Sequence, residues 1–209
     1  MEMEVIILDI TYILHFVIGY LFGSIPFALI IGKVFHNIDI REHGSGNLGG
    51  TNAGRVLGRK SGVAVMVLDV LKAIIPVLVI VGLGNVNYAI IAGFGITVGH
   101  CYPLFANFRG GKAVSTVYGF IGASTLSNFS QFAWLLLLPL LIFFTITKTT
   151  KYVSLGAMSS LGIANILSYF VQQNILLSIS ITILWIFVVF RHIPNIKNLI
   201  NKNERKVKW

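Results

Sequence analysis

Charged residues are scarce in this chain of 209 residues. Asp, Glu, Lys and Arg together make up 11% of the sequence, whereas 56% of the residues are hydrophobic. A soluble globular domain carries about 25% charged residues, because it must cover its surface with them. This composition therefore excludes an ordinary water-soluble protein and indicates a single membrane domain over residues 1–209.

Cysteine is nearly absent as well. Cys101 is the single cysteine of the chain, which excludes an internal disulfide and a multi-cysteine metal site. The start of the chain lacks the basic residues of a cleaved signal peptide. The first apolar run is also long enough to span a bilayer, so we expect it to remain as a membrane anchor.

The basic residues outnumber the acidic ones, with a net charge of +9. They lie between apolar segments and do not form a continuous basic face, which argues against binding to nucleic acid. In a membrane protein, such an excess indicates topology and attraction to anionic lipid.

Long apolar runs predict the membrane-spanning helices, each of which needs about 20 residues. Clear candidates are residues 5–31, 61–82, 131–147, 153–171 and 175–190. Two shorter runs, 88–98 and 113–124, are either short spans or a re-entrant pair inside the bundle. The sequence therefore predicts an all-α integral membrane protein with about seven transmembrane helices, or five as the alternative.

The connecting segments alternate between basic and uncharged. Apart from Lys33, just after the first span, Lys and Arg outside the spans are confined to residues 36–60, 100–112, 148–151 and the tail from residue 191 onward. The connectors at 83–87, 125–128 and 172–174 carry no charge. The positive-inside rule places the basic segments in the cytoplasm, with the N-terminus outside and the C-terminus cytoplasmic. The acidic residues Glu2, Glu4 and Asp9 near the N-terminus agree with this orientation. An arrangement with five spans would place the two termini on the same sides.

Glycine is concentrated in the first basic loop, residues 41–55, among small polar residues and between two arginines. Glycines such as Gly44 and Gly46 allow turns whose successive N–H groups form an anion site. The guanidinium of Arg55 suits bidentate binding of phosphate. A merely flexible loop is the alternative, but the combination with Asn, Thr and flanking Arg favours a phosphate cradle.

Two further polar segments carry candidate anion-binding groups. Gly110 and Gly111 precede Lys112 at the start of a short apolar helix, where an anion is favoured, although Lys112 could equally be a topological anchor. After the last span, His192 and Asn195 stand three residues apart, on one face of a helical turn. His192 could bind phosphate or act as a base, or could be an ordinary interfacial histidine.

Other polar residues within or near the spans have structural interpretations. Asp69 and Lys72, at positions i and i+3, are expected to form an ion pair inside the bundle. His100 is expected to be structural, and Pro26 to bend the first span near its cytoplasmic end. The basic tail, residues 197–208, is expected to lie on anionic lipid.

Taken together, these motifs resemble those of the bacterial membrane glycerol-3-phosphate acyltransferases that use acyl phosphate as donor. The resemblance covers almost the whole chain. It rests on residues 23–27, on residues 44–52 with Arg55, on residues 99–112, on Thr147, Lys148, Tyr152 and Ser154, and on Arg191, His192, Asn195 and Glu204. The chain departs from the family pattern at Gly50, Tyr102, Arg109, Ala113, Ile193, Pro194, Lys202 and Asn203. Pro194 is the departure most relevant to local geometry.

The resemblance implies a seven-helix enzyme of the bacterial cytoplasmic membrane with its active site on the cytoplasmic face. It implies transfer of a fatty acyl group from acyl phosphate to the 1-hydroxyl of sn-glycerol 3-phosphate, without metal or nucleotide cofactor. The implied substrate site of the first loop is Ser45, Asn47, Thr51, Asn52 and Arg55. Lys112, His192 and Asn195 are implied to hold the phosphates and the reacting carbonyl, with Ser45 beside them. No nucleic acid or obligate protein partner is expected.

The general base is open between His192 and the phosphate of glycerol 3-phosphate, and we favour the phosphate. A transporter of organic phosphates is the alternative function, but transporters commonly bind near the bilayer midplane, whereas these groups gather at one face. A CDP-alcohol phosphotransferase would need an aspartate-rich metal site, and the three aspartates of this chain, Asp9, Asp39 and Asp69, lie far apart.

Overall fold

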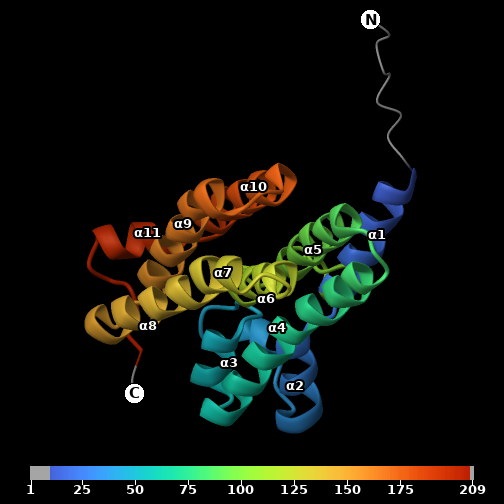
Figure 1. Ribbon diagram of the computed structural model, residues 1–209. Coiled ribbons are helices and arrows are strands. Elements are labelled where there is room, and N and C mark those ends of the chain that lie inside the picture. Colours follow the sequence, from blue (N-terminus) through green and yellow to red (C-terminus); the bar gives the residue numbers. More distant parts are fainter. Residues whose placement is uncertain (1–9, 208–209) are drawn as a thin grey trace, which may run out of the picture.

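The computed structural model describes residues 10–207, which form a bundle of helices without strands in that range (Figure 1). The start of the predicted first span, the acidic residues Glu2, Glu4 and Asp9, and Lys208 of the tail lie outside the described residues. The all-α prediction is therefore confirmed for the part of the chain that can be described.

The helices follow one another with short loops between them. They are α1 (Ile10–Gly23), α2 (Phe27–His36), η1 (Ile40–Glu42), α3 (Gly50–Val56), α4 (Arg59–Gly82), α5 (Val86–Cys101), η2 (Leu104–Ala106), α6 (Val114–Thr125), α7 (Phe129–Phe132), the π-helix η3 (Ala133–Leu137), α8 (Leu138–Thr150), α9 (Val153–Val171), α10 (Ile175–Arg191) and α11 (Ile193–Ile200).

Among residues 10–207, five helical segments are long and apolar enough to cross a membrane. They are Ile10–His36, Arg59–Gly82, Val86–Ala106, Phe129–Thr150 and Val153–Val171. A sixth is the pair α10 and α11, if it counts as one span bent by 55°. These agree with the predicted spans, including the short run 88–98, which lies within α5.

Helix α6 corresponds to the other short run, 113–124. Its length explains why the sequence allows either seven or five membrane crossings. Its 12 residues extend about 18 Å, well short of a hydrocarbon core of about 30 Å. Most of its side chains are buried against other helices, so protein covers the helix over most of its length. The seven-span arrangement therefore remains a prediction.

Asparagine fixes the start of a helix after each uncharged connector. The side chains of Asn85, Asn128 and Asn174 accept hydrogen bonds from backbone N–H groups at the beginnings of α5, α7 and α10. Such caps satisfy N–H groups that have no partner within the helix. The side chain of Asn174 also donates to Asn87, 3.0 Å away, which brings two of the uncharged connectors together at one end of the bundle.

Helices α1 and α5 pack closely because glycines line their contact. A methyl group built at Gly19, Gly23, Gly95 or Gly99 would overlap a backbone carbonyl of the opposite helix. These residues form Gly-xxx-Gly pairs on both helices, the pattern that lets helix backbones approach in lipid. The glycine spacing therefore determines how α1 sits against α5.

Pro26 interrupts the first span as predicted. α1 ends at Gly23 and α2 begins at Phe27, which leaves the carbonyl of Ile25 to accept a hydrogen bond from Lys72 at 3.0 Å. Lys72 also pairs with Asp69 at 2.8 Å and contacts Nδ1 of His100 at 3.0 Å. The expected ion pair is confirmed, and it joins α4, α5 and the break after α1.

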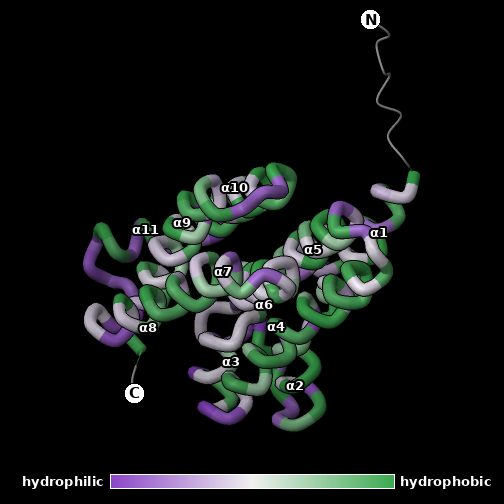
Figure 2. Tube along the Cα trace, in the orientation of Figure 1, coloured by the Kyte–Doolittle hydropathy of each residue, from purple (hydrophilic) through white to green (hydrophobic). Residues whose placement is uncertain are grey.

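Figure 2 shows hydrophilic stretches beside α2, α3 and α11 and also at the end of α10 and beside α6 and α7, whereas the tubes of the long helices are mostly hydrophobic. The predicted site residues lie in the segments that lead into α3 and α6, on α3, and at the start of α11.

We expect Gly23→Ala to destabilise the protein by about 1–3 kcal/mol, because its methyl group would push α1 away from α5. Gly82→Ala is the matched control, since a methyl group there meets no atom within 4 Å. Thermal unfolding in lipid or detergent would measure both. Equal stability of the two variants would contradict the close packing of α1 and α5.

Candidate active site

The glycine-rich loop is held in place by the side chain of Asn52 on α3. Asn52 is 2% exposed. Its Oδ1 accepts a hydrogen bond from the backbone N–H of Ser45 at 2.9 Å, and its Nδ2 donates to the carbonyl of His43 at 3.1 Å. These two hydrogen bonds fix the loop on α3 and leave the Ser45 side chain exposed in the lining of the cavity described below.

Glycine is required at two positions of this loop. Gly44 and Gly46 have φ angles of 66° and 68°, which other residues adopt only with strain. A side chain at Gly44 would also overlap the amide oxygen of Asn52. The glycines therefore shape the turn on which Ser45 sits.

The two arginines that flank the loop have different environments. Arg41 donates to Asp39 from Nε at 2.9 Å and from Nη2 at 2.6 Å, and these bonds hold the pKa of Asp39 below its usual range. Arg41 is therefore neutralised locally. Arg55, on the last turn of α3, lies exposed at the cavity described below.

Lys112 is linked to the C-terminal segment through an amide. Its ammonium donates to Oδ1 of Asn195, and Nδ2 of Asn195 donates to Glu204 at 2.6 Å. Glu204 also accepts from the hydroxyl of Ser154 at 2.7 Å. Among residues 10–207, no carboxylate lies within 4.0 Å of the Lys112 nitrogen. The charge of Lys112 is positioned but not neutralised by direct contact.

The electrostatics of Lys112 reflect this arrangement. Burial lowers the pKa of its ammonium, Glu204 opposes that shift, and the nearby charges of Arg191 and Arg55 lower the pKa further. An ammonium held under these conditions is stabilised by an incoming anion.

The side chain of Arg191 holds the backbone of the second polar loop. Its guanidinium donates to the carbonyl of Gly111 at 3.0 and 3.2 Å and to that of Gly110 at 3.4 Å, and it stacks over Tyr102. Gly111 in turn packs directly on the ring of His100, where a side chain would overlap. His100 is thus structural, as expected, and supports the turn before Lys112.

His192 stands at the junction of α10 and α11. Its Nδ1 lies 2.8 Å from the carbonyl of Val188, so Nδ1 carries a proton and Nε2 of the neutral ring is an acceptor. Asn195 follows within the first turn of α11, and Pro194 fits there without losing a hydrogen bond. The departure at Pro194 therefore does not disturb this turn.

A cavity of about 670 Å³ lies between these segments. Its charged lining comprises Arg55, Asp69, Arg109, Lys112, Arg191, Glu204 and Arg205. Asp69 is paired with Lys72, so Glu204 is the one carboxylate of the lining without a direct cationic partner in the described chain. The cavity carries an excess of positive charge and suits anionic ligands.

Most of the predicted site residues meet in this cavity. Those in its lining are Ser45, Gly46, Asn47, Thr51, Asn52, Arg55, Gly110, Lys112, His192 and Asn195. Gly44 and Gly111 are not in the lining. They pack against the side chains of Asn52 and His100.

The contribution of the tail was not foreseen from the sequence. Residues 201–207 turn back, and the N–H of Val207 donates to the carbonyl of Lys151 at 2.9 Å. This turn places Glu204 and Arg205 in the cavity lining, although the tail was expected to lie on lipid. Glu204 and Ser154 could be noticed only as parts of the family motifs, and no local pattern marked Arg205.

Comparisons with known proteins agree on one family. Residues 13–202 match the model of the family described as glycerol-3-phosphate acyltransferase. The chain is 43% identical over 196 residues to a glycerol-3-phosphate acyltransferase of Geobacillus kaustophilus, covering 92% of this chain and 94% of that protein. It is 44% identical over 198 residues to one of Bacillus subtilis, covering 92% and 96%.

Solved structures give the same result. The crystal structure of PlsY (YgiH), an integral membrane glycerol 3-phosphate acyltransferase, in its glycerol 3-phosphate form superimposes with a TM-score of 0.86 at 31% identity. That match covers 94% of this chain and 96% of PlsY. The lysophosphatidic acid form of PlsY superimposes with a TM-score of 0.84 at 30% identity.

We expect Asn52→Ala to loosen the glycine-rich loop, because the N–H of Ser45 and the carbonyl of His43 lose their partner. A buried hydrogen-bond loss of about 1–3 kcal/mol corresponds to faster amide exchange at Ser45 by about one to two orders of magnitude. Asn198→Ala, at an exposed residue of the same cavity, is the control. Unchanged exchange in Asn52→Ala would show that the loop is fixed by other contacts.

Proposed function

This chain belongs to the glycerol-3-phosphate acyltransferase family, and from that membership we propose that it transfers a fatty acyl group from acyl phosphate to the 1-hydroxyl of sn-glycerol 3-phosphate. The products are lysophosphatidic acid and inorganic phosphate. The chain is an acyltransferase with several membrane helices, and the family membership argues against the transporter and phosphotransferase alternatives.

The observation that carries the proposal is a cationic cavity that continues into an apolar one. The cavity with Arg55 and Lys112 shares Met66, Val114 and Phe143 with an apolar cavity of about 410 Å³. A charged acceptor and a donor with a phosphate head and a hydrocarbon tail need two such environments side by side.

Binding both substrates at once requires the positive charge. Two unit charges 4 Å apart repel each other by about 4 kcal/mol at an effective dielectric constant of 20. The N–H groups of Ser45 and Gly46 already donate within the loop, so we assign the phosphates to Arg55 and Lys112. The side chains of Ser45, Asn47 and Thr51 are further donors at the edge. The excess of cations over carboxylates in the lining would offset the repulsion.

The chemistry needs no strong leaving-group activation, because acyl phosphate is already a mixed anhydride. The 1-hydroxyl oxygen attacks the acyl carbon, the bond from that carbon to the phosphate oxygen breaks, and phosphate leaves with the electron pair. Lys112, held by Asn195, would stabilise negative charge on the carbonyl or the departing phosphate. Holding both substrates in the cavity would add a proximity contribution, up to about 7–11 kcal/mol in the best cases.

The hydroxyl proton has two candidate acceptors. Nε2 of His192 is one, because the contact from Nδ1 to Val188 leaves it to accept. The phosphate of glycerol 3-phosphate is the other, and we favour it because the cations that line the cavity would hold that phosphate beside the reacting hydroxyl. In that arrangement, His192 and Asn195 position the substrates.

We also propose that the cavity opens on the cytoplasmic face of the bacterial cytoplasmic membrane, with seven crossings and the N-terminus outside. The basic loops that meet at the cavity belong on the cytoplasmic side by the positive-inside rule. The hydrogen bond between Asn87 and Asn174 joins two uncharged connectors away from them, in agreement with that parity. Helix α6 would complete the count as a short crossing covered by its neighbours.

An acyl-transfer assay tests the proposed donor. Purified protein in lipid would receive glycerol 3-phosphate with palmitoyl phosphate, palmitoyl-CoA or palmitoyl-acyl carrier protein. We expect lysophosphatidic acid and phosphate from palmitoyl phosphate alone, and none from Lys112→Ala. Product from a thioester donor alone would overturn the donor but not the enzyme class.

The substitution His192→Gln separates the two bases. If phosphate accepts the proton, we expect a weaker affinity for glycerol 3-phosphate and a fall in kcat of less than about a hundredfold, since loss of a general base costs about 10²–10⁴-fold. Steady-state kinetics measure both, with His36→Gln, outside the cavity, as control. A larger fall in kcat at unchanged KM would identify His192 as the base.

A further inference from the structure

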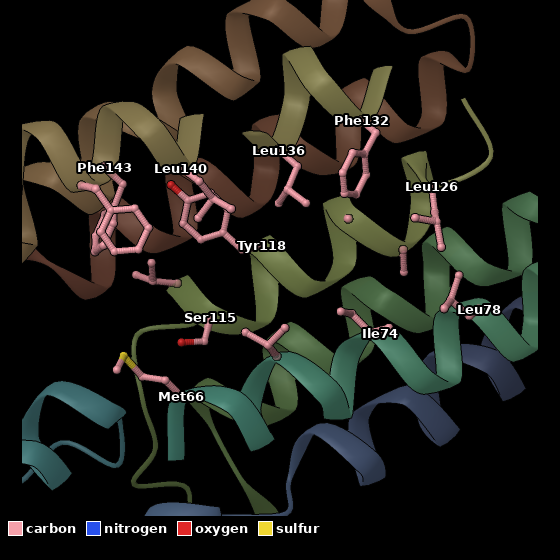
Figure 3. A pocket seen from close by; sticks show the side chains of 15 residues that line it. Met66, Ile74, Leu78, Ser115, Tyr118, Leu126, Phe132, Leu136, Leu140 and Phe143 are labelled. Carbon is pink, nitrogen blue, oxygen red and sulfur yellow. The ribbon is translucent and has the colours of Figure 1, made fainter. Parts of the chain in front are cut away.

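The apolar cavity is a trough between three helices. Figure 3 shows Met66 and Ser115 at one end, and Leu78, Leu126 and Phe132 at the other. Its lining residues recur at helical spacing along α4, α6 and the segment of η3 and α8, so one face of each helix forms a wall. These faces are Met66, Val70, Ile74 and Leu78 on α4; Ser115, Tyr118 and Gly122 on α6, with Leu126 directly after it; and Leu136, Leu140 and Phe143 on η3 and α8.

The direction of the trough follows from its two ends. Met66, Ser115 and Phe143 also line the cationic cavity, so that end adjoins the reacting groups. The distance from Ser115 to Leu126 along α6 is about 16 Å, and that from Met66 to Leu78 along α4 is about 18 Å. The trough therefore leads away from the site over a length comparable to an extended fatty acyl chain.

Gly122 is the point in the wall of α6 against which the side chain of Leu136 packs. It lies about 10 Å along the helix from Ser115, roughly two thirds of the way to Leu126. A methyl group built there would lie 3.1 Å from Cδ2 of Leu136 on the opposite wall. A larger side chain at residue 122 would have to displace Leu136, and the two side chains together would narrow the trough at this depth.

With the acyl chain of the donor in this trough, we propose that Gly122 sets the longest chain that the enzyme uses efficiently, because it leaves room for Leu136 beside α6 and so keeps that side chain out of the far third of the trough. The inference rests on the proposed acyl transfer and adds a residue that determines chain-length specificity. Gly122 does not line the cationic cavity, so it acts on the hydrocarbon tail alone.

The test is Gly122→Leu, assayed with octanoyl, dodecanoyl and palmitoyl phosphate. Each methylene excluded from the trough should lower kcat/KM by about fourfold, because burial of one methylene is worth about 0.8 kcal/mol. We therefore expect the ratio of kcat/KM for palmitoyl over octanoyl donor to fall by about tenfold to a hundredfold. A uniform loss over all chain lengths, or no loss, would overturn the inference.

Two further variants separate chain length from damage to the fold. Val79→Leu enlarges a side chain of α4 that is 58% exposed and outside the trough, and its chain-length profile should match that of the unaltered protein. Adding Leu136→Ala to Gly122→Leu should restore use of the palmitoyl donor, because it reopens the trough at the same depth. Failure of this rescue in a folded double variant would also contradict the role of Gly122.

The outcome is independent of the donor assignment. If the unaltered protein used a thioester donor instead of acyl phosphate, the same chain-length series with that donor would still test Gly122. If the unaltered protein transfers acyl groups without any dependence on chain length, the proposed function stands and this inference fails.

Discussion

The contact between Lys112 and Asn195 is the interaction on which the arrangement of the site depends. The amide of Asn195 accepts from Lys112 and donates to Glu204, which also accepts from Ser154. This chain of hydrogen bonds connects the start of α6, α11, the tail and α9. Because an amide stands between the ammonium and the carboxylate, Lys112 keeps its charge available for a substrate phosphate.

Lys72 illustrates the opposite outcome for the same residue type. It pairs directly with Asp69, contacts His100 and donates to the carbonyl of Ile25. Burying an ion pair is costly unless every group is hydrogen-bonded, and here the bend after α1 supplies the remaining acceptor. His100 then carries Gly111 on its ring, so the buried pair supports the turn that precedes Lys112.

Much of the site was predictable because its motifs are local. The glycines of residues 41–55, the turn before Lys112 and the spacing of His192 and Asn195 each indicate anion binding within a few residues. The number of crossings was less predictable, because α6 is stable as a short helix only where other helices cover it. The loop contacts of Asn52 and the return of the tail depend on partners distant in sequence, which no local pattern can specify.

The sequence by itself determined that the protein lies in a membrane and that it is helical, and it predicts that the basic loops share one side. Hydropathy and charge decide these properties segment by segment, since each apolar run must satisfy its own backbone hydrogen bonds in lipid. Only the tertiary structure decided which polar groups face the cavity, how Glu204 reaches Asn195, and that Gly122 packs against Leu136 beside the trough. Those features depend on the distances between helices. Close glycine contacts, such as those between α1 and α5, set these distances, and they form only when the helices pack.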